Sequence, residues 1–217
     1  MRDLILASAS PRRQELLRLL GLPFRVMVAD ADEDSITDPD PAANVVATAH
    51  LKAVTIAARC ESPAIIIASD TTVALDGQML NKPANAAAAW QMLQALRGRI
   101  HYVHTGLVLL NTATGQTITD VATVPVPMRD YSDAEIAVYI ATGDPLDKAG
   151  AYAIQHPEFQ PVIRLDGCFA GVMGFPLCHL TRALRQMGVQ IGVDIAAACQ
   201  RHIQYDCPVH EGILGQS

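Results

Sequence analysis

The sequence lacks the features that tie a protein to a membrane or to a nucleic acid. No apolar run approaches the roughly 20 residues needed to span a bilayer. The first residues, with Arg2 and Asp3 before a short apolar run, do not form the longer apolar segment of a signal peptide. A formal net charge of −6 leaves no excess of the basic residues with which nonspecific nucleic-acid binders displace counterions. We therefore expect a cytoplasmic protein with no nucleic-acid partner and no membrane partner.

Motifs for disulfides, metals and dinucleotides are also missing. The chain has five cysteines but no Cys-x-x-Cys pair, and an odd number without a signal peptide argues against a disulfide framework. We interpret them as buried or incidental thiols. His101 and His104 are close in sequence, but their spacing on a strand would point them to opposite faces, which disfavours a zinc site. No Gly-x-Gly-x-x-Gly follows a strand, which removes the simplest dinucleotide-binding interpretation. The cysteines are Cys60, Cys168, Cys178, Cys199 and Cys207.

Apolar residues are abundant, at 50% of the 217 residues, which is enough for a substantial core without disulfide staples. Periodic helical stretches alternate with short apolar strands and hairpin signals, so the sequence predicts an α/β fold with a mixed twisted sheet and flanking helices. The predicted strands cover residues 4–7, 24–28, 64–69, 72–75, 79–80, 101–110 and 116–126. The predicted helices cover a segment starting at Ser10, then 41–59, 85–96, 132–141 and 177–187, and the tail could hold a short helix up to about Tyr205.

The first predicted strand leads into an unusually positive helix start. Ser10 is a good N-cap, and Pro11 suits the first helical position. Arg12 and Arg13 then add positive charge where the helix dipole is already positive, so we expect an anion to bind there. The small residue Ser8 in the turn would let a phosphate approach the backbone. A pair of solvated surface arginines is the competing interpretation, and the local sequence does not separate the two.

Acidic and basic residues recur at the predicted ends of elements, where α/β proteins place their sites. Asp70 directly follows the apolar run 64–68, so we expect the strand to end there and its carboxylate to lie in a crevice. Glu33 and Asp70 together suit a hard divalent ion such as Mg²⁺, bound along with substrate phosphate. Lys52 and Lys82 would then neutralise the remaining phosphate charge. Taken alone, Asp70 also has a simpler interpretation as a turn residue, and Lys52 as part of a solvated helix face, whereas the constrained loop around Lys82 favours a functional role.

Several separated motifs occur in the same order as in the Maf family of nucleoside triphosphate pyrophosphatases, which this chain resembles from about residue 4 to residue 187. The matching segments are Leu4-Ile5-Leu6-Ala7-Ser8-Ala9-Ser10-Pro11-Arg12-Arg13, Glu15-Leu16-Leu17, Asp32-Glu33, Lys52-Ala53, Ser69-Asp70-Thr71, Lys82-Pro83 and Asp144-Pro145-Leu146-Asp147-Lys148-Ala149-Gly150-Ala151-Tyr152-Ala153-Ile154-Gln155. The resemblance implies a Maf/ITPase-like fold of two lobes around a central cleft. Residues 1–190 would form a single catalytic domain and 191–217 a C-terminal tail.

The activity that this resemblance implies is hydrolysis of a nucleoside triphosphate between its α and β phosphates, with Mg²⁺ or Mn²⁺, releasing the monophosphate and pyrophosphate. The family also suggests a homodimer with a housecleaning role, removing noncanonical nucleotides. The implied site residues are Asp70 as proton acceptor, Glu33 as a second catalytic carboxylate, Lys52 and Lys82 as catalytic cations, and Ser8 and Arg13 as substrate-binding groups. The two carboxylates are also the implied metal ligands.

The pyrimidine branch of the family is similar to this chain at three positions associated with specificity, Arg12, Thr71 and Gln155. A primary amide such as that of Gln155 can accept from N3–H of thymine or uracil and donate to a neighbouring carbonyl at once. A site built on such bonds rejects a base that cannot complete them. We therefore expect dTTP and UTP, with related modified pyrimidine nucleotides, as substrates. A purely structural Gln155 at the end of a strand is the alternative.

The chain departs from the family pattern along one wall of the expected site. It has Cys168-Phe169-Ala170-Gly171 where tyrosine, serine and asparagine are common, Ile163 in place of an acid, and Asn81 in place of glycine before Lys82. Because these changes remove polar groups, a nucleotide-binding regulator of cell division, related to septum inhibition and with little or no turnover, stays open as a second function. A phosphomonoesterase, which would release orthophosphate, is a third.

Overall fold

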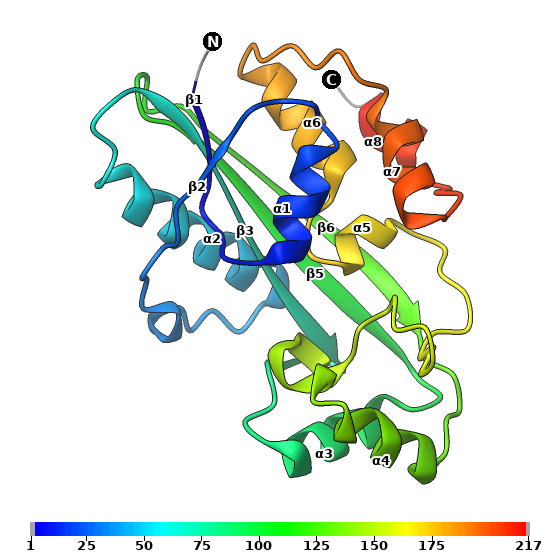
Figure 1. The fold of residues 1–217 in the computed structure, drawn as a ribbon. Coiled ribbons are helices and arrows are strands. Elements are labelled where there is room, and N and C mark those ends of the chain that lie inside the picture. Colours follow the sequence, from blue (N-terminus) through cyan, green and yellow to red (C-terminus); the bar gives the residue numbers. More distant parts are fainter. Residues whose placement is uncertain (1–2, 216–217) are drawn as a thin grey trace.

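A six-stranded mixed sheet runs through the computed structural model, which describes residues 3–215 (Figure 1). The strands are β1 (Asp3–Leu6), β2 (Arg25–Val26), β3 (Ala64–Leu75), β4 (Gln78–Leu80), β5 (Ile100–Asn111) and β6 (Thr117–Pro127). Their order is β2-β1-β3-β5-β6, and β4 pairs with β3 off this path. β1 pairs in parallel with β2 and β3, whereas β5 is antiparallel to both β3 and β6. The predicted α/β fold with a mixed sheet is confirmed.

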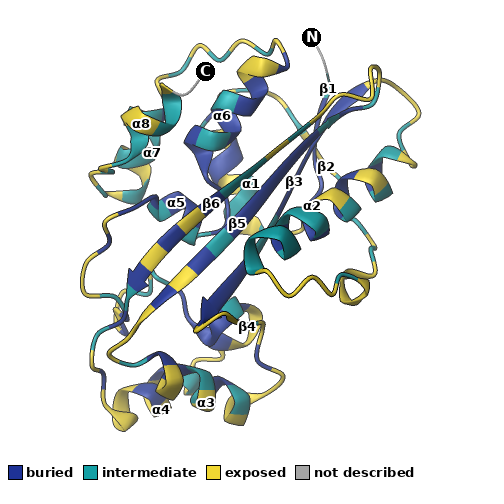
Figure 2. Ribbon diagram, turned by 180° about the vertical axis from the view of Figure 1, so that it is seen from behind, coloured by how far each residue is buried: buried dark blue, intermediate teal, exposed yellow. Residues whose placement is uncertain are grey.

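Helices cover both faces of the sheet and extend beyond one end of it. They are α1 (Pro11–Arg18), α2 (Pro41–Ala57), α3 (Ala86–Leu96), α4 (Asp133–Ala141), α5 (Phe169–Val172), α6 (Leu177–Gln186), α7 (Ile195–Ile203) and α8 (His210–Leu214), with 3-10 turns η1 (Glu33–Ser35), η2 (Asp144–Asp147) and η3 (Ala149–Ala151). α2 lies on one face, while α1, α5 and α6 lie on the other. Figure 2 shows the central strands buried between these layers, with α3 and α4 together at the far end.

The predicted helix start at Ser10 is confirmed. The Ser10 side chain accepts a hydrogen bond from the backbone N–H of Arg13 at 3.4 Å. Pro11 occupies the first helical position, where no N–H is needed. Leu16 and Leu17 are buried in the core, so the turn that precedes the helix is held against the sheet.

The strand that was expected to end at Asp70 does not end there. β3 continues to Leu75, because β5 pairs with it along Ile65–Ala74. β1 pairs only with Ala64–Ile67, so Asp70 lies just beyond the end of β1 while remaining inside β3. The predicted break between two strands was wrong, since pairing along a whole neighbouring strand overrides the turn preference of a single aspartate.

α2 lies unusually close to the sheet. Ala49 and Ala53, two small residues on its inward face, are fully buried. Gly106 on β5 completes this close approach, because a Cβ atom at that position would lie 2.6 Å from the backbone oxygen of Val45. Only glycine fits there. The same helix therefore brings Lys52, which is buried, directly onto the sheet.

The C-terminal segment packs against the body of the protein. The short helix expected near its start is present as α7, and α8, which was not predicted, follows it. Both helices contact α6, and Arg182 on α6 donates to the backbone oxygen of Ile213 at 3.2 Å. The last two residues of the predicted tail, 216 and 217, lie outside the described residues. Within residues 3–215, no helix is both long enough and apolar enough to cross a membrane.

Candidate functional site

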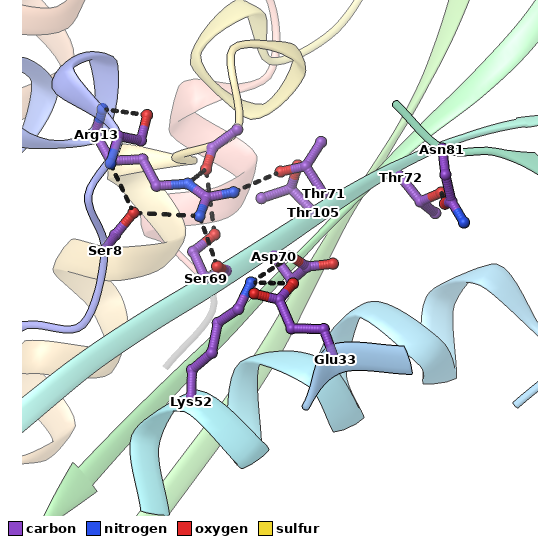
Figure 3. A network of polar contacts seen from close by, with 12 residues as sticks. Ser8, Arg13, Glu33, Lys52, Ser69, Asp70, Thr71, Thr72, Asn81 and Thr105 are labelled. Carbon is purple, nitrogen blue, oxygen red and sulfur yellow. Dashed lines mark hydrogen bonds and ion pairs between the residues drawn. The ribbon is translucent and has the colours of Figure 1, made fainter. Parts of the chain in front are cut away.

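Lys52 joins two carboxylates at the centre of the candidate site. Its Nζ donates to Asp70 Oδ1 at 2.7 Å and lies 2.9 Å from Glu33 Oε2 (Figure 3). The exposed fraction of the side chain is 10% for Lys52, 19% for Asp70 and 50% for Glu33. One buried cation thus faces two carboxylates, and the Arg13 guanidinium also interacts electrostatically with both of them.

These three groups come from separate elements. β3 supplies Asp70 beyond the end of β1, α2 supplies Lys52, and η1 supplies Glu33 from the acidic loop before α2. Their side chains meet because α2 packs so closely on the sheet at Gly106. The sequence predicted that these three residues form one site, and the structure brings them together.

Arg13 bonds extensively to the protein itself. Its Nη1 donates to the Ser69 backbone oxygen at 2.7 Å and to Ser8 Oγ at 3.4 Å. Its Nε donates to the Gly174 backbone oxygen at 3.0 Å, and its Nη2 donates to Thr71 Oγ1 at 3.2 Å. Burial lowers the pKa of the Arg13 guanidinium, but this group stays charged at neutral pH. These bonds tie α1, β3 and the segment after α5 into one wall of the site, as Figure 3 shows.

The hydroxyl of Thr71 is engaged in the same wall. It lies 2.9 Å from Thr105 Oγ1, and Thr105 in turn donates to the backbone oxygen of Gly171 at 2.9 Å. Because Thr105 uses its proton on Gly171, the Thr71 hydroxyl donates to Thr105 and accepts from Arg13. A hydroxyl has one proton to donate, so that of Thr71 is used inside the protein.

A cavity of about 910 Å³ connects these groups. Every site residue predicted from the sequence lines it, with the exception of Gln155, which is exposed and lies outside the lining. Arg12 is half-buried at the start of α1, and Lys82 is exposed directly after β4. The predicted residues in the lining are Ser8, Arg12, Arg13, Glu33, Lys52, Asp70, Thr71 and Lys82.

Other residues of the lining were missed from the sequence. Asn44 and Thr48 on α2 line the same cavity as Lys52. Asn44, Thr48 and Lys52 follow one another at intervals of four residues, which places all three on one helix face. That periodicity is the sequence signal by which Asn44 and Thr48 could have been found.

Lys148 and Tyr152, from the motif between Asp144 and Gln155, line the cavity as well. Lys148 Nζ donates to Asp144 Oδ1 at 2.8 Å and to Asp147 Oδ1 at 2.5 Å. The Tyr152 hydroxyl lies 2.7 Å from His101 Nε2. The Lys148 bonds stay within the segment that contains η2 and η3, and the contact between Tyr152 and His101 ties that segment to β5.

His101 and His104 point to opposite faces of the sheet, as their spacing predicts. His101 is fully buried beside Tyr152, whereas His104 Nδ1 lies 3.0 Å from Thr123 Oγ1 in an exposed contact. Burial lowers the pKa of His101 from 6.5 to about 4. The ring is therefore neutral at physiological pH and serves to position the Tyr152 hydroxyl.

Glu33 and Asp70 have the chemistry to hold a divalent ion. Both carboxylates contact the same Lys52 ammonium, so they lie near one another, and carboxylate oxygens are the ligands that Mg²⁺ prefers. Among residues 3–215, no group of three or more His, Cys, Asp and Glu side chains is arranged to hold a metal.

Comparison with known proteins gives one family match and many relatives. A family model described as "Maf-like protein" matches residues 3–187. The chain is 40% identical over 191 residues to a dTTP/UTP pyrophosphatase of Desulforamulus reducens, covering 88% of this chain and 100% of that protein. It is 42% identical over 186 residues to a dTTP/UTP pyrophosphatase of Alkaliphilus metalliredigens, covering 86% and 96%. Among solved structures, the Ham1 protein of Staphylococcus aureus aligns at a TM-score of 0.45 and 16% identity, over 59% of this chain and 73% of that chain.

Proposed function

Since this chain belongs to the Maf-like protein family, we propose that it hydrolyses dTTP and UTP to the nucleoside monophosphate and pyrophosphate. The relatives with about 40% identity are named dTTP/UTP pyrophosphatases, and they align with this chain over most of its length. The observation that carries the proposal is the contact of one buried lysine, Lys52, with both Glu33 and Asp70 inside a large cavity. A pure binding protein has little need of two carboxylates where a polyanionic nucleotide must approach.

Asp70 would orient the attacking water and accept its proton. Lys52 holds the Asp70 carboxylate in place through a hydrogen bond of 2.7 Å. Lys82, which lines the cavity, would bind the phosphates that leave as pyrophosphate. Arg13 would act on the substrate mainly by shaping the wall, because its guanidinium already bonds to four protein oxygens.

Glu33 and Asp70 would hold Mg²⁺ or Mn²⁺. When bound, the ion supplies stabilisation of phosphate charge and a lowered pKa for the attacking water. Lys52 would keep the two carboxylates together while substrate is absent.

Base selection is assigned in this proposal to Arg12, Thr71 and Gln155. The Thr71 hydroxyl is used within the protein, so Thr71 would act through the position of Arg13. Gln155 is exposed outside the cavity lining, so its contact with a base requires a movement of the segment after η3. Gln155→Glu, which keeps the shape but removes a donor, tests this assignment by its effect on the preference for dTTP and UTP.

The test of the reaction is a nucleotide panel with identification of products. With Mg²⁺ or Mn²⁺, we expect pyrophosphate and the monophosphate from dTTP and UTP. Asp70→Asn should abolish turnover, while Glu61→Gln, which neutralises an exposed carboxylate outside the cavity lining, should not. Orthophosphate as the product would indicate a phosphomonoesterase. Binding without turnover, unchanged by Asp70→Asn, would indicate the nucleotide-binding regulator.

The proposal also includes a homodimeric enzyme that works in the cytoplasm, as the family resemblance implies. Sedimentation analysis of the purified protein tests the first part, and fractionation of cells tests the second. A monomer at working concentrations would remove the dimer from the proposal without affecting the reaction.

A further inference from the structure

Four of the five cysteines gather at one place, where the C-terminal segment meets the body of the protein. Cys168 and Cys178 belong to the body, at the start of α5 and in α6, and Cys199 and Cys207 belong to the segment after it. All four line one small hollow with a volume of about 10 Å³. That is room for about one water molecule, so the hollow does not suit an organic ligand. The notable feature of this hollow is instead the four thiols that line it.

Cys207 lies against the segment of the body that carries Cys168. The Cys207 thiol lies 3.9 Å from the backbone oxygen of Gly167, the residue that precedes Cys168. Tyr205 holds the same stretch, since its hydroxyl lies 2.7 Å from the Leu165 oxygen and 3.1 Å from the Gly167 oxygen. The two thiols therefore sit on neighbouring segments that are tied together by hydrogen bonds.

The two thiols differ in accessibility. Cys168 is 7% exposed, and burial raises its pKa to about 12. Burial has the same effect on Cys178 and Cys199. By exposure, Cys199 and Cys207 are both partly buried, whereas Cys168 and Cys178 are buried. A reagent from solution reacts with a thiol that it can reach. Of the two partly buried thiols, Cys207 is the one whose sulfur lies against the backbone beside Cys168.

Cys168 is connected directly to the wall of the substrate cavity. Its sulfur accepts a hydrogen bond from the Gly171 N–H at 3.3 Å and so caps α5. The residues that follow, Val172, Met173 and Gly174, line the cavity. The Gly174 backbone oxygen accepts bonds from Arg13 and from Ser69. A change in the position of the Cys168 sulfur is therefore transmitted to the wall by a short stretch of chain.

We propose that Cys207 and Cys168 form a redox modification site for small disulfides, which links the C-terminal segment covalently to the cavity wall. The Cys207 thiolate attacks a disulfide such as oxidised glutathione, forming a mixed disulfide and releasing one glutathione thiol. The Cys168 sulfur then attacks the Cys207 sulfur and forms the Cys168–Cys207 bond, while the Cys168 proton passes to the departing glutathione sulfur, which leaves as the second thiol. Two protein thiols are oxidised and one small disulfide is reduced to two thiols. The new bond takes the Cys168 sulfur from its capping position, so turnover falls.

The experiment treats the folded, reduced full-length protein with oxidised glutathione and maps the products by mass spectrometry of the intact chain and its peptides. We expect a peptide pair joined through Cys168 and Cys207, reversed by dithiothreitol. Cys168→Ser should leave glutathione on Cys207, Cys207→Ser should give neither product, and the matched control Cys60→Ser should behave as the wild type. Glutathione elsewhere, a bond between Cys178 and Cys199, or no reaction would overturn the site. Mapping of the wild type decides this even if a variant fails to fold.

The effect on turnover rests on the proposed pyrophosphatase activity and is measured separately. We expect the disulfide form to release pyrophosphate several-fold more slowly than the reduced form, with recovery after dithiothreitol. Equal rates would overturn the link to the cavity wall. If the reduced protein hydrolyses no nucleotide, the proposed function fails, while the peptide map still decides the modification site.

Discussion

At the scale of single residues, two buried side chains determine how the cavity is organised. Lys52 contacts Glu33 and Asp70, so it holds together two carboxylates that would otherwise repel each other. The neutral imidazole of His101 lies on the other face of the sheet, where it positions the Tyr152 hydroxyl. Lys52 acts through its charge, whereas His101 acts as an uncharged ring. Each role leads to its own prediction.

Lys52→Met should reduce kcat for pyrophosphate release by about 10²- to 10³-fold, the usual cost of removing one preorganised charge-stabilising group from an active site. The substitution keeps the length of the side chain while leaving Glu33 and Asp70 without their shared cation. Steady-state kinetics on dTTP measures the effect. Arg164→Met removes a cation whose side chain is 80% exposed and should leave kcat unchanged. A Lys52→Met enzyme with normal turnover would show that the contact serves the fold only.

His101 makes the stability of the protein depend on pH. Its pKa is about 4 when folded and 6.5 in an unfolded chain, so between these values the unfolded state binds the extra proton. The free energy of unfolding should therefore be fully maintained above pH 6.5 and fall as the pH drops toward 4. With 1.36 kcal/mol for each pKa unit, the full loss is about 3 kcal/mol.

Urea denaturation on both sides of this pH window, with the wild type and His101→Gln, measures the dependence. The variant has no titrating ring at this position, so its stability should vary less with pH across the window. Equal slopes for the two proteins would mean that another group is responsible.

At the scale of elements, the approach of α2 to β5 decides whether the site assembles. Gly106 allows the helix backbone to lie against the strand, and this contact sets the height of Lys52 above Asp70. Helix starts and the hairpin positions could be predicted from caps and turn residues. The continuity of β3 through Asp70 could not, because pairing with β5 decides it. For the same reason the predicted strand 24–28 is reduced to Arg25–Val26, the two residues that pair with β1.

Gly106→Ala should destabilise the protein by about 1–3 kcal/mol, the usual cost of overpacking. The added Cβ would meet the Val45 backbone, which cannot move aside as a side chain can. Turnover should fall as well, because α2 carries Lys52. Gly192→Ala is the matched control, since a Cβ there has no atom within 4 Å. Chemical denaturation and kinetics together check this, and a fully stable Gly106→Ala protein would contradict it.

At the scale of the whole molecule, the C-terminal segment is part of the folded body although the family match ends at residue 187. Ile195 is buried, and Cys199, Ile203, Tyr205 and Leu214 pack against the main core. The segment therefore covers apolar surface of α5 and α6. This contact brings the cysteines of the C-terminal segment next to those of α5 and α6. The sequence could not predict it, because the segment after residue 187 carries no family motif.

Removal of residues 191–217 should lower the free energy of unfolding by at least about 2 kcal/mol, the contribution expected from burying one large aliphatic side chain such as Ile195. The remaining residues 1–190 correspond to the predicted catalytic domain. Chemical denaturation of the full and shortened chains measures the difference. Equal stability would show that the segment adds nothing to the core and that the predicted boundary marks an independent unit.

The sequence by itself determined the α/β composition, the start of α1 at Ser10 and the set of charged residues around Asp70. These depend on local signals, which are caps, periodicity and short motifs, and such signals act between residues that are near each other in the chain. The family resemblance then indicated the reaction before any geometry was known.

Only the tertiary structure decided what each of these residues contacts. Arg12 and Arg13 are adjacent, yet Arg13 bonds to the Gly174 oxygen, 161 residues away, while Gln155 lies outside the cavity that its motif suggested. Partners at such separations are chosen by strand pairing, close packing and burial. These act between segments that the chain brings together only when it folds, so no local pattern could have assigned them.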